Sequence, residues 1–220
     1  MSEESSHPED TIENTYTDIG ADTPEGFSIS SRSRELARKV VGNNTPEDRI
    51  RQRCSIAVGD WAMAKLMRFQ NNPIGAGIKA LENGADIFTD IRMVSMGIQK
   101  RGHSSKVECA LDFGADISEA KGITRSSAGF TALKDRLEGS IIVIGNAPSA
   151  LITVCEFIDE GVIPGLVIGT PVGFVNAAES KELLRTKKNV SAVSNEGTRG
   201  GTPVAVASLN EIITMYVERH

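Results

Sequence analysis

The sequence predicts an α/β fold: a doubly wound, mainly parallel sheet of about five strands, flanked by helices and preceded by a helical N-terminal region. Three observations predict it. From about residue 86 onward, short and almost wholly apolar segments alternate with helical segments, as in a parallel sheet covered on both faces. The segments predicted between residues 28 and 83 are all helices. With 220 residues, 40% hydrophobic and 24% charged, the chain can build one domain with a substantial core.

The first 27 residues differ in composition from the rest. They contain eight acidic side chains, no Lys or Arg, and few large apolar groups. Such a segment cannot bury enough surface to offset the entropy lost on ordering. We therefore predict a disordered acidic tail over residues 1–27 and a single α/β domain over residues 28–220. The domain carries a net charge of about +3, which permits an anionic ligand.

The helical region is predicted from its start and stop residues. A helix over Ser28–Val41 begins with Ser and ends before a glycine. Residues 45–48 (Thr-Pro-Glu-Asp) form a capping-box-like start for a helix that runs to about Val58. A third helix covers Pro73–Asn83 and ends at Gly84, the residue type that helix C-termini prefer.

The sheet is predicted from five compact apolar segments. They are Asp86–Thr89, Val107–Leu111, Ser140–Ile144, Leu166–Ile168 and Ala192–Ser194. The accompanying helices are expected around Ser126–Leu137, Ser149–Asp159, Ala177–Leu184 and Val204–Val217. In such a sheet, ligands bind beyond the carboxyl ends of the strands.

Composition and motifs exclude several classes of function. Three Cys and three His are too scattered for a disulfide framework or a zinc site. The longest apolar runs are strand-length, no signal peptide is present, and aromatic residues are only 5% with no basic stripe. We therefore expect a cytoplasmic protein with no membrane partner, no nucleic-acid partner and no protein-bound metal. Dinucleotide and phosphate-loop motifs and the hydrolase nucleophile turn are also absent, so an ordinary nucleotide-binding domain has little support.

Three loops after predicted strands could bind an anion. They are Gly145–Ser149, Gly169–Gly173 and Asn195–Pro203, and each precedes a predicted helix. Glycine lets the backbone approach a ligand closely, and a helix start offers N–H groups to carboxylate or phosphate. Arg199 and Arg125 add guanidinium groups suited to carboxylates. Together these loops indicate a sizeable anionic ligand at one edge of the sheet.

Several segments resemble the precorrin-8X methylmutase family. Residues 143–151 (Val-Ile-Gly-Asn-Ala-Pro-Ser-Ala-Leu) resemble its Gly-Asn-Ala-Pro-Thr/Ser-Ala segment, and residues 167–181 (Val-Ile-Gly-Thr-Pro-Val-Gly-Phe-Val-Asn-Ala-Ala-Glu-Ser-Lys) resemble a second segment almost throughout. Residues 197–201 are similar to its Arg-Gly-x-x-Gly-Gly loop, with Glu196 in place of the leading Arg. Residues 32–33, 90–94 and 124–126 match shorter elements, and the likeness covers about residues 28–215.

The resemblance implies a homodimeric isomerase of corrin (cobalamin, vitamin B12) biosynthesis. It moves a methyl group from C-11 to C-12 of (cobalt-)precorrin-8 and gives a cobyrinate-type product. No organic cofactor is implied, and any cobalt is carried within the substrate, a polycarboxylate tetrapyrrole. The matched motifs imply Arg125 as a catalytic residue. The predicted substrate-binding residues are Ser33, Thr124, Gly145, Asn146, Ala147, Pro148, Gly173, Asn195, Gly197, Arg199, Gly200 and Gly201.

One position departs from the family pattern. The family's proton-donor His corresponds to Ile56 here, and isoleucine cannot transfer a proton. Two hypotheses follow. Either another donor (Ser55, Asp60 or a water bound to Arg125) supports the isomerisation, or the protein is a relative that binds a corrinoid without isomerising it. Trp61 is also open to two interpretations, stacking on a macrocycle or packing in a core or interface.

Overall fold

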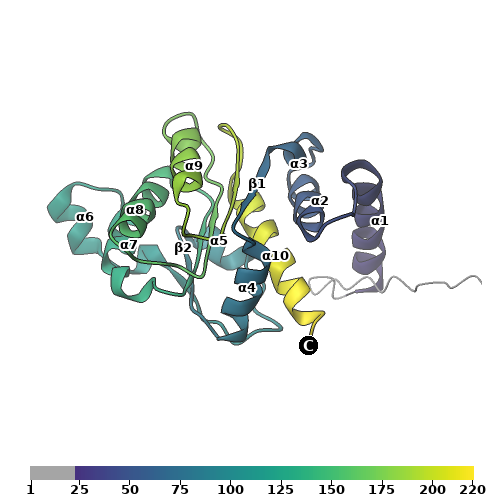
Figure 1. Cartoon of the computed structure of the whole chain (residues 1–220), viewed down its shortest axis with the longest axis horizontal. Coiled ribbons are helices and arrows are strands. Elements are labelled where there is room, and N and C mark those ends of the chain that lie inside the picture. The colour runs from purple at the N-terminus through teal and green to yellow at the C-terminus, as the bar shows by residue number, and fades with distance from the viewer. Residues whose placement is uncertain (1–22) are drawn as a thin grey trace, which may run out of the picture.

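The computed structural model describes residues 23–220, and the expected α/β fold is confirmed (Figure 1). The sheet has six strands in the order β1-β6-β5-β4-β2-β3. All pairings are parallel except that of β1 with β6. The strands are β1 (Met67–Gln70), β2 (Ile87–Thr89), β3 (Val107–Cys109), β4 (Ile141–Ile144), β5 (Leu166–Gly169) and β6 (Ala192–Asn195).

All seven predicted helices are present, and the described chain has three further short ones. The helices are α1 (Pro24–Val41), α2 (Pro46–Val58), α3 (Ala62–Leu66), α4 (Pro73–Glu82), α5 (Arg92–Gly97), α6 (Ala115–Lys121), α7 (Arg125–Ala132), α8 (Pro148–Asp159), α9 (Ala177–Thr186) and α10 (Thr202–Val217), with 3-10 turns at Ala110–Asp112 and Lys134–Arg136. No described helix has the length and apolar character needed to cross a membrane.

Four elements were not predicted: β1, α3, α5 and α6. The strand β1 is short, lies at the sheet edge and alternates polar with apolar residues, so it lacks the continuous apolar pattern of the other strands. It joins the sheet through pairing with β6, from Met67 opposite Asn195 to Gln70 opposite Ala192. The three missed helices have only five to seven residues, too few for a clear helical period.

Two helix predictions need correction. The predicted tail extended to residue 27, but α1 begins at Pro24, where the Thr23 side chain accepts a hydrogen bond from Gly26 N (3.1 Å). The rest of the predicted tail lies outside the described residues. The helix predicted over Ser126–Leu137 ends at Ala132, and the chain tightens into a 3-10 turn before it enters β4.

Helices cover both faces of the sheet. In Figure 1, α7, α8 and α9 lie on one side, α4 and α10 lie on the other, and α1 to α3 form a further layer outside α10. Two apolar clusters fill the interfaces, one centred on Phe88, Phe130 and Leu151 and the other on Ile87, Ile168 and Leu209. The strands β4 and β5 are fully buried, as expected for a sheet covered on both faces.

A buried ion network attaches the N-terminal helices to the body. The Glu211 carboxylate on α10 is wholly buried and pairs with Arg34 of α1 and with Arg49 of α2 (2.7 Å). Arg53 of α2 lies 3.5 Å from the same carboxylate. The helix α2 begins with the expected capping box, in which Thr45 and Asp48 bond reciprocally, so its start is well defined.

Candidate active site

Two of the three predicted ligand loops lie side by side at the carboxyl edge of the sheet. Gly201 N donates to Thr170 O (2.7 Å), and Gly173 N donates to Thr198 O (3.0 Å). These bonds join the loop after β5 to the loop after β6. The third loop is next to them, because a Cβ on Gly145 would lie 3.0 Å from Thr202 Cα in the first turn of α10. The structure therefore gathers Gly145, Gly173 and residues 195–201.

The loop at 145–147 does not offer free backbone donors, contrary to the expectation from sequence. The buried Asp90 carboxylate accepts hydrogen bonds from Gly145 N (3.2 Å), Asn146 N (2.7 Å) and Ala147 N (2.8 Å). Burial raises the pKa of Asp90, and the three donors oppose that change. The anion that this loop binds is thus part of the protein. Asp90 therefore shapes the site by fixing the backbone of this loop.

The loop at 195–201 is anchored from both sides. Arg199 forms an ion pair with Asp60, which follows α2. Its carbonyl oxygen accepts hydrogen bonds from Lys181 Nζ (2.6 Å) and from Asn195 Nδ2. Asn195, predicted to bind substrate, is fully buried and instead organises this loop. Gly200 has a φ of +145°, and a Cβ there would lie 2.3 Å from Thr170 O, so only glycine fits.

Thr124 and Arg125 occupy the start of α7. The Thr124 hydroxyl bonds Ser149 Oγ at 2.8 Å, which joins this helix start to the first turn of α8. Both hydroxyls line a hollow of about 510 Å³. Arg125 is exposed, and its Nη2 donates to Leu111 O (3.2 Å). Its guanidinium keeps four further N–H donors for a carboxylate.

Ile56 is half-buried in a separate hollow of about 270 Å³ between α2 and α10. The walls include Arg53, one helical turn before Ile56, together with Pro203, Val206 and Asn210 of α10. Asn210 fixes the end of α5, because its Nδ2 donates to Gly97 O (2.9 Å) and its Oδ1 accepts from Gln99 N (2.8 Å). The hollow beside Ile56 is lined mainly by apolar side chains, with Arg53 and Asn210 as its polar residues.

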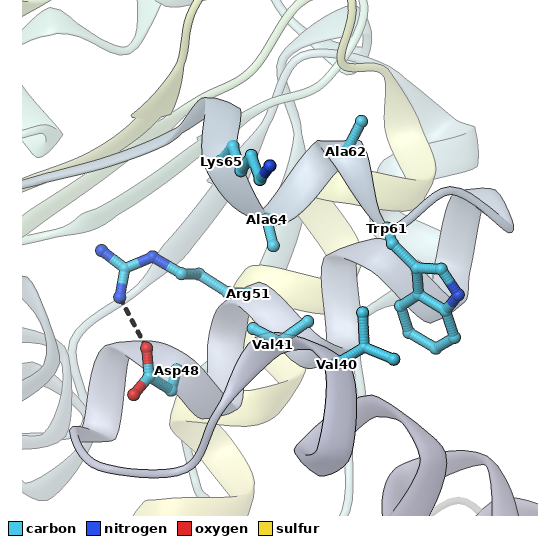
Figure 2. A pocket seen from close by; sticks show the side chains of 8 residues that line it. All are labelled: Val40, Val41, Asp48, Arg51, Trp61, Ala62, Ala64 and Lys65. Atoms are coloured by element: carbon cyan, nitrogen blue, oxygen red, sulfur yellow. Dashed lines mark hydrogen bonds and ion pairs between the residues drawn. The ribbon is translucent and has the colours of Figure 1, made fainter.

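A third hollow, of about 520 Å³, lies where α1 ends against α2 and α3 (Figure 2). Figure 2 shows the Trp61 ring beside Val40, with the Arg51–Asp48 ion pair (2.9 Å) on the opposite wall. Trp61 is 42% exposed, so it does not pack in a core. None of the predicted substrate-binding residues lines this hollow.

Ser33 is the one predicted residue that the structure separates from the others. It is half-buried on α1, and α1 packs on α2 in the layer outside α10. Figure 1 shows α1 as the outermost helix of this layer, away from the sheet. The edge loops and Ser33 are therefore not neighbours within one chain.

The three cysteines, too scattered in the sequence for a disulfide framework, are free and buried in the structure. Burial raises the pKa of Cys54 and of Cys155 to about 12, and it also raises the pKa of Cys109. Thiols with such values are poor nucleophiles at neutral pH. Within residues 23–220, no group of three His, Cys, Asp or Glu side chains is arranged to hold a metal ion.

Two site residues have roles that the sequence did not predict. Asp60, a candidate proton donor in the sequence, pairs with Arg199 and accepts a hydrogen bond from Ala62 N (2.8 Å). Lys181, the last residue of the 167–181 motif, is wholly buried. A signal for Lys181 was present, because it lies on the same helical face as Ala177 and Leu184, both fully buried.

Comparison with known proteins agrees with these motifs. Residues 28–215 match the family described as CbiC, precorrin-8X methylmutase. A cobalt-precorrin-8 methylmutase from Methanocaldococcus jannaschii is 40% identical over 207 residues, covering 89% of this chain and 96% of that protein. One from Methanothermobacter thermautotrophicus is 35% identical, covering 91% and 98%.

Solved structures agree as well. A crystal structure of precorrin-8X methyl mutase from Thermus thermophilus superposes with a TM-score of 0.80 at 31% sequence identity, covering 88% of this chain and 97% of that one. Because the profile match spans most of the chain and the relatives are aligned over nearly their full length, the chain belongs to the precorrin-8X methylmutase family, whose members are isomerases of cobalamin biosynthesis.

Proposed function

We propose that this protein moves a methyl group from C-11 to C-12 of (cobalt-)precorrin-8 and releases a cobyrinate-type product. The observation that carries the proposal is the gathering of the family's motif loops at one edge of the sheet, where backbone contacts of Gly145, Gly173 and Gly201 hold the loops together and residues 197–199 are exposed. A macrocycle bearing several acetate and propionate arms needs donors spread over such a surface. Arg125 and the 195–201 loop would each receive a carboxylate arm.

The proposed reaction is an internal rearrangement. It needs no oxidant, reductant or group carrier, so we propose that no organic cofactor takes part. Any cobalt would enter and leave as part of the substrate. The work of the protein is then to orient the macrocycle and to hold its charged arms while one carbon–carbon bond breaks and another forms.

Position 56 carries no imidazole, so the proposed mechanism cannot use a proton donor there. Ser55 is buried inside the helical layer, and the Asp60 carboxylate is already held by Arg199 and Ala62 N. Neither group is presented in the hollow beside Ile56. We therefore propose catalysis by orientation, with no side-chain acid at this position. General-acid assistance is worth about 10²–10⁴ in rate, so turnover should be slower than with an imidazole present.

The direct experiment is incubation of the purified protein with precorrin-8 and, in parallel, with cobalt-precorrin-8. Methyl migration changes the absorption spectrum of the macrocycle, and mass spectrometry would give an unchanged mass, as expected for an isomerisation. Heat-denatured protein is the control. A spectral change that saturates at one equivalent of protein, without product, would instead identify a corrinoid-binding relative and contradict the proposal.

We also propose that the protein is a cytoplasmic homodimer. Ile29, Leu36 and Val40 on α1 are each at least half exposed, and such apolar groups favour contact with a second copy. Three free thiols suit a reducing compartment. Sedimentation equilibrium would test the dimer, and a purely monomeric protein at micromolar concentration would refute it.

A further inference from the structure

Lys181 is a buried cation at the edge of the proposed substrate site. It lies on α9 with 0% exposure, and its Nζ donates to Arg199 O (2.6 Å) and to Asn195 Oδ1 (3.4 Å). Within the described chain, no carboxylate forms an ion pair with it. Lysine is almost never fully buried without a paired anion, because desolvating an ammonium group is costly. The structure therefore retains an uncompensated positive charge directly beneath the loop at 195–201.

The bond to Arg199 O also sets the direction of the next peptide N–H. The peptide between Arg199 and Gly200 is trans, so its N–H points opposite to its carbonyl group. Since the carbonyl is turned inward to Lys181 and Asn195, the Gly200 N–H is turned outward. Across residues 23–220, no group accepts a hydrogen bond from it.

We propose that Lys181 is a positioning residue for the methyl-migration reaction: it holds the Arg199–Gly201 loop so that the Gly200 N–H faces the substrate, and its charge behind that N–H attracts a carboxylate arm. This inference rests on the proposed function. It adds a residue that touches no substrate atom and acts through the loop.

None of the charged groups that the structure describes around Lys181 neutralises its ammonium group, because each of them has another partner or is exposed. On α9, Arg185 donates to Ser194 Oγ and Asn195 O (both 3.3 Å), and on the loop Arg199 is neutralised by Asp60. The packed helix α8 contributes Asp159, but this carboxylate pairs with Lys187 (2.6 Å), which directly follows α9, and Glu156 is exposed. The strand β6 carries no charged side chain, and the Glu196 after it pairs with Arg68.

Burial, and secondarily Arg185, lower the pKa of Lys181 to about 8. The charge is thus present below pH 8 and lost above it. Substrate affinity should fall as the pH rises through about 8. Stability should change in the opposite direction, because between about pH 8 and the ordinary lysine value the unfolded chain binds more protons than the folded one. If Lys181 acts on the substrate, affinity should fall as the pH rises through about 8. If Lys181 is purely structural, affinity should stay constant while the free energy of unfolding increases over the same range.

The test uses the full chain and measures KM and kcat for cobalt-precorrin-8 between pH 7 and 9.5. In the wild type, KM should rise at least fivefold over this range. Lys181→Arg, which stays charged, should remove that rise and keep KM within about threefold of the wild-type value at pH 7. Lys181→Met should raise KM at least tenfold at pH 7 with kcat changed less than threefold, and its KM should not depend on pH.

The matched control is Lys187→Met, which removes another buried lysine on the same stretch of chain, outside the site. It should lower the melting temperature and leave KM unchanged. A wild-type KM that is flat across the pH range, or a KM of Lys181→Met equal to that of the wild type, would overturn the inference while turnover itself upholds the proposed function. If the wild type neither binds nor converts precorrin-8, the proposed function and the inference about Lys181 are both wrong.

Discussion

At the scale of single residues, position 56 is the clearest departure from the family pattern. Ile56 lines a hollow with Arg53 and Asn210, so its side chain faces open space beside the first turns of α10. Two predictions follow at this scale, one for Ile56 and one for Arg125.

Replacing Ile56 by histidine should accelerate methyl migration. The hollow of about 270 Å³ can accept an imidazole, and the neighbouring Arg53 would hold its pKa low enough for the neutral and charged forms to exchange near neutral pH. We expect kcat to rise by about tenfold or more, the lower part of the usual gain from general-acid catalysis. Ile56→Leu is the control and should leave kcat unchanged. Equal rates for the His and Leu variants would show that no proton donor is needed here.

Replacing Arg125 by alanine should weaken tetrapyrrole binding by more than tenfold. The guanidinium is exposed at the start of α7 and makes a single described hydrogen bond, to Leu111 O, so its loss should cost little stability. Fluorescence or absorbance titration would measure the affinity. Arg136→Ala is the control, because Arg136 pairs with Asp86 and Glu108 near the starts of β2 and β3, away from the site. Unchanged affinity in Arg125→Ala would show that Arg125 does not bind the tetrapyrrole.

At the scale of elements, the loop between β4 and α8 depends on an acid from another strand. Asp90 follows β2 and closes the loop through three backbone N–H groups. Since β2 and β4 are adjacent and parallel, with Thr89 opposite Val143, the carboxylate comes directly beside the loop. The loop is therefore rigid before any ligand arrives.

Asp90→Asn should destabilise the protein by about 3 kcal/mol, since an amide has one accepting oxygen in place of two and at least one buried N–H loses its partner. Urea unfolding would measure the loss. Asp112→Asn is the control, because Asp112 forms an exposed ion pair with Arg92 and its loss should cost less than about 1 kcal/mol. Similar stabilities for the two variants would contradict the role assigned to Asp90.

At the scale of the whole molecule, one buried carboxylate connects the helical layer to the sheet layer. Glu211 of α10 is the shared partner of Arg34 on α1 and Arg49 on α2. Removing its charge leaves these guanidinium groups without that partner in a buried setting, which is costly. The position of α2, and with it the hollow beside Ile56, therefore depends on α10.

Glu211→Gln should lower the free energy of unfolding by about 3 kcal/mol. It should also make the N-terminal helices more susceptible to limited proteolysis than the sheet, because only they lose an ionic attachment. Glu35→Gln, which breaks a fully exposed pair with Lys39, should leave the free energy of unfolding and the proteolysis pattern unchanged. Uniform proteolysis along the chain in Glu211→Gln would show that the helical layer is held mainly by apolar contacts.

The sequence predicted the five parallel strands to within two residues at each end and most of the helices. These predictions depend on local patterns: a continuous apolar run for a strand such as β4, or a capping box for α2. Local patterns failed for β1, whose alternation is that of an edge strand, and for helices of five to seven residues. The start of α1 was also missed, because an acidic composition outweighed the Thr-Pro helix start.

The sequence by itself determined the family and the edge of the sheet at which its motifs meet, because short motifs and the alternation of strands with helices follow from residues that are near each other along the chain. Only the tertiary structure decided which polar groups on that edge are already paired. Asp90 lies more than fifty residues before the loop that it closes, and Asp60 is still farther in sequence from Arg199. Such pairings depend on how strands and helices pack, and no local pattern in the chain encodes them.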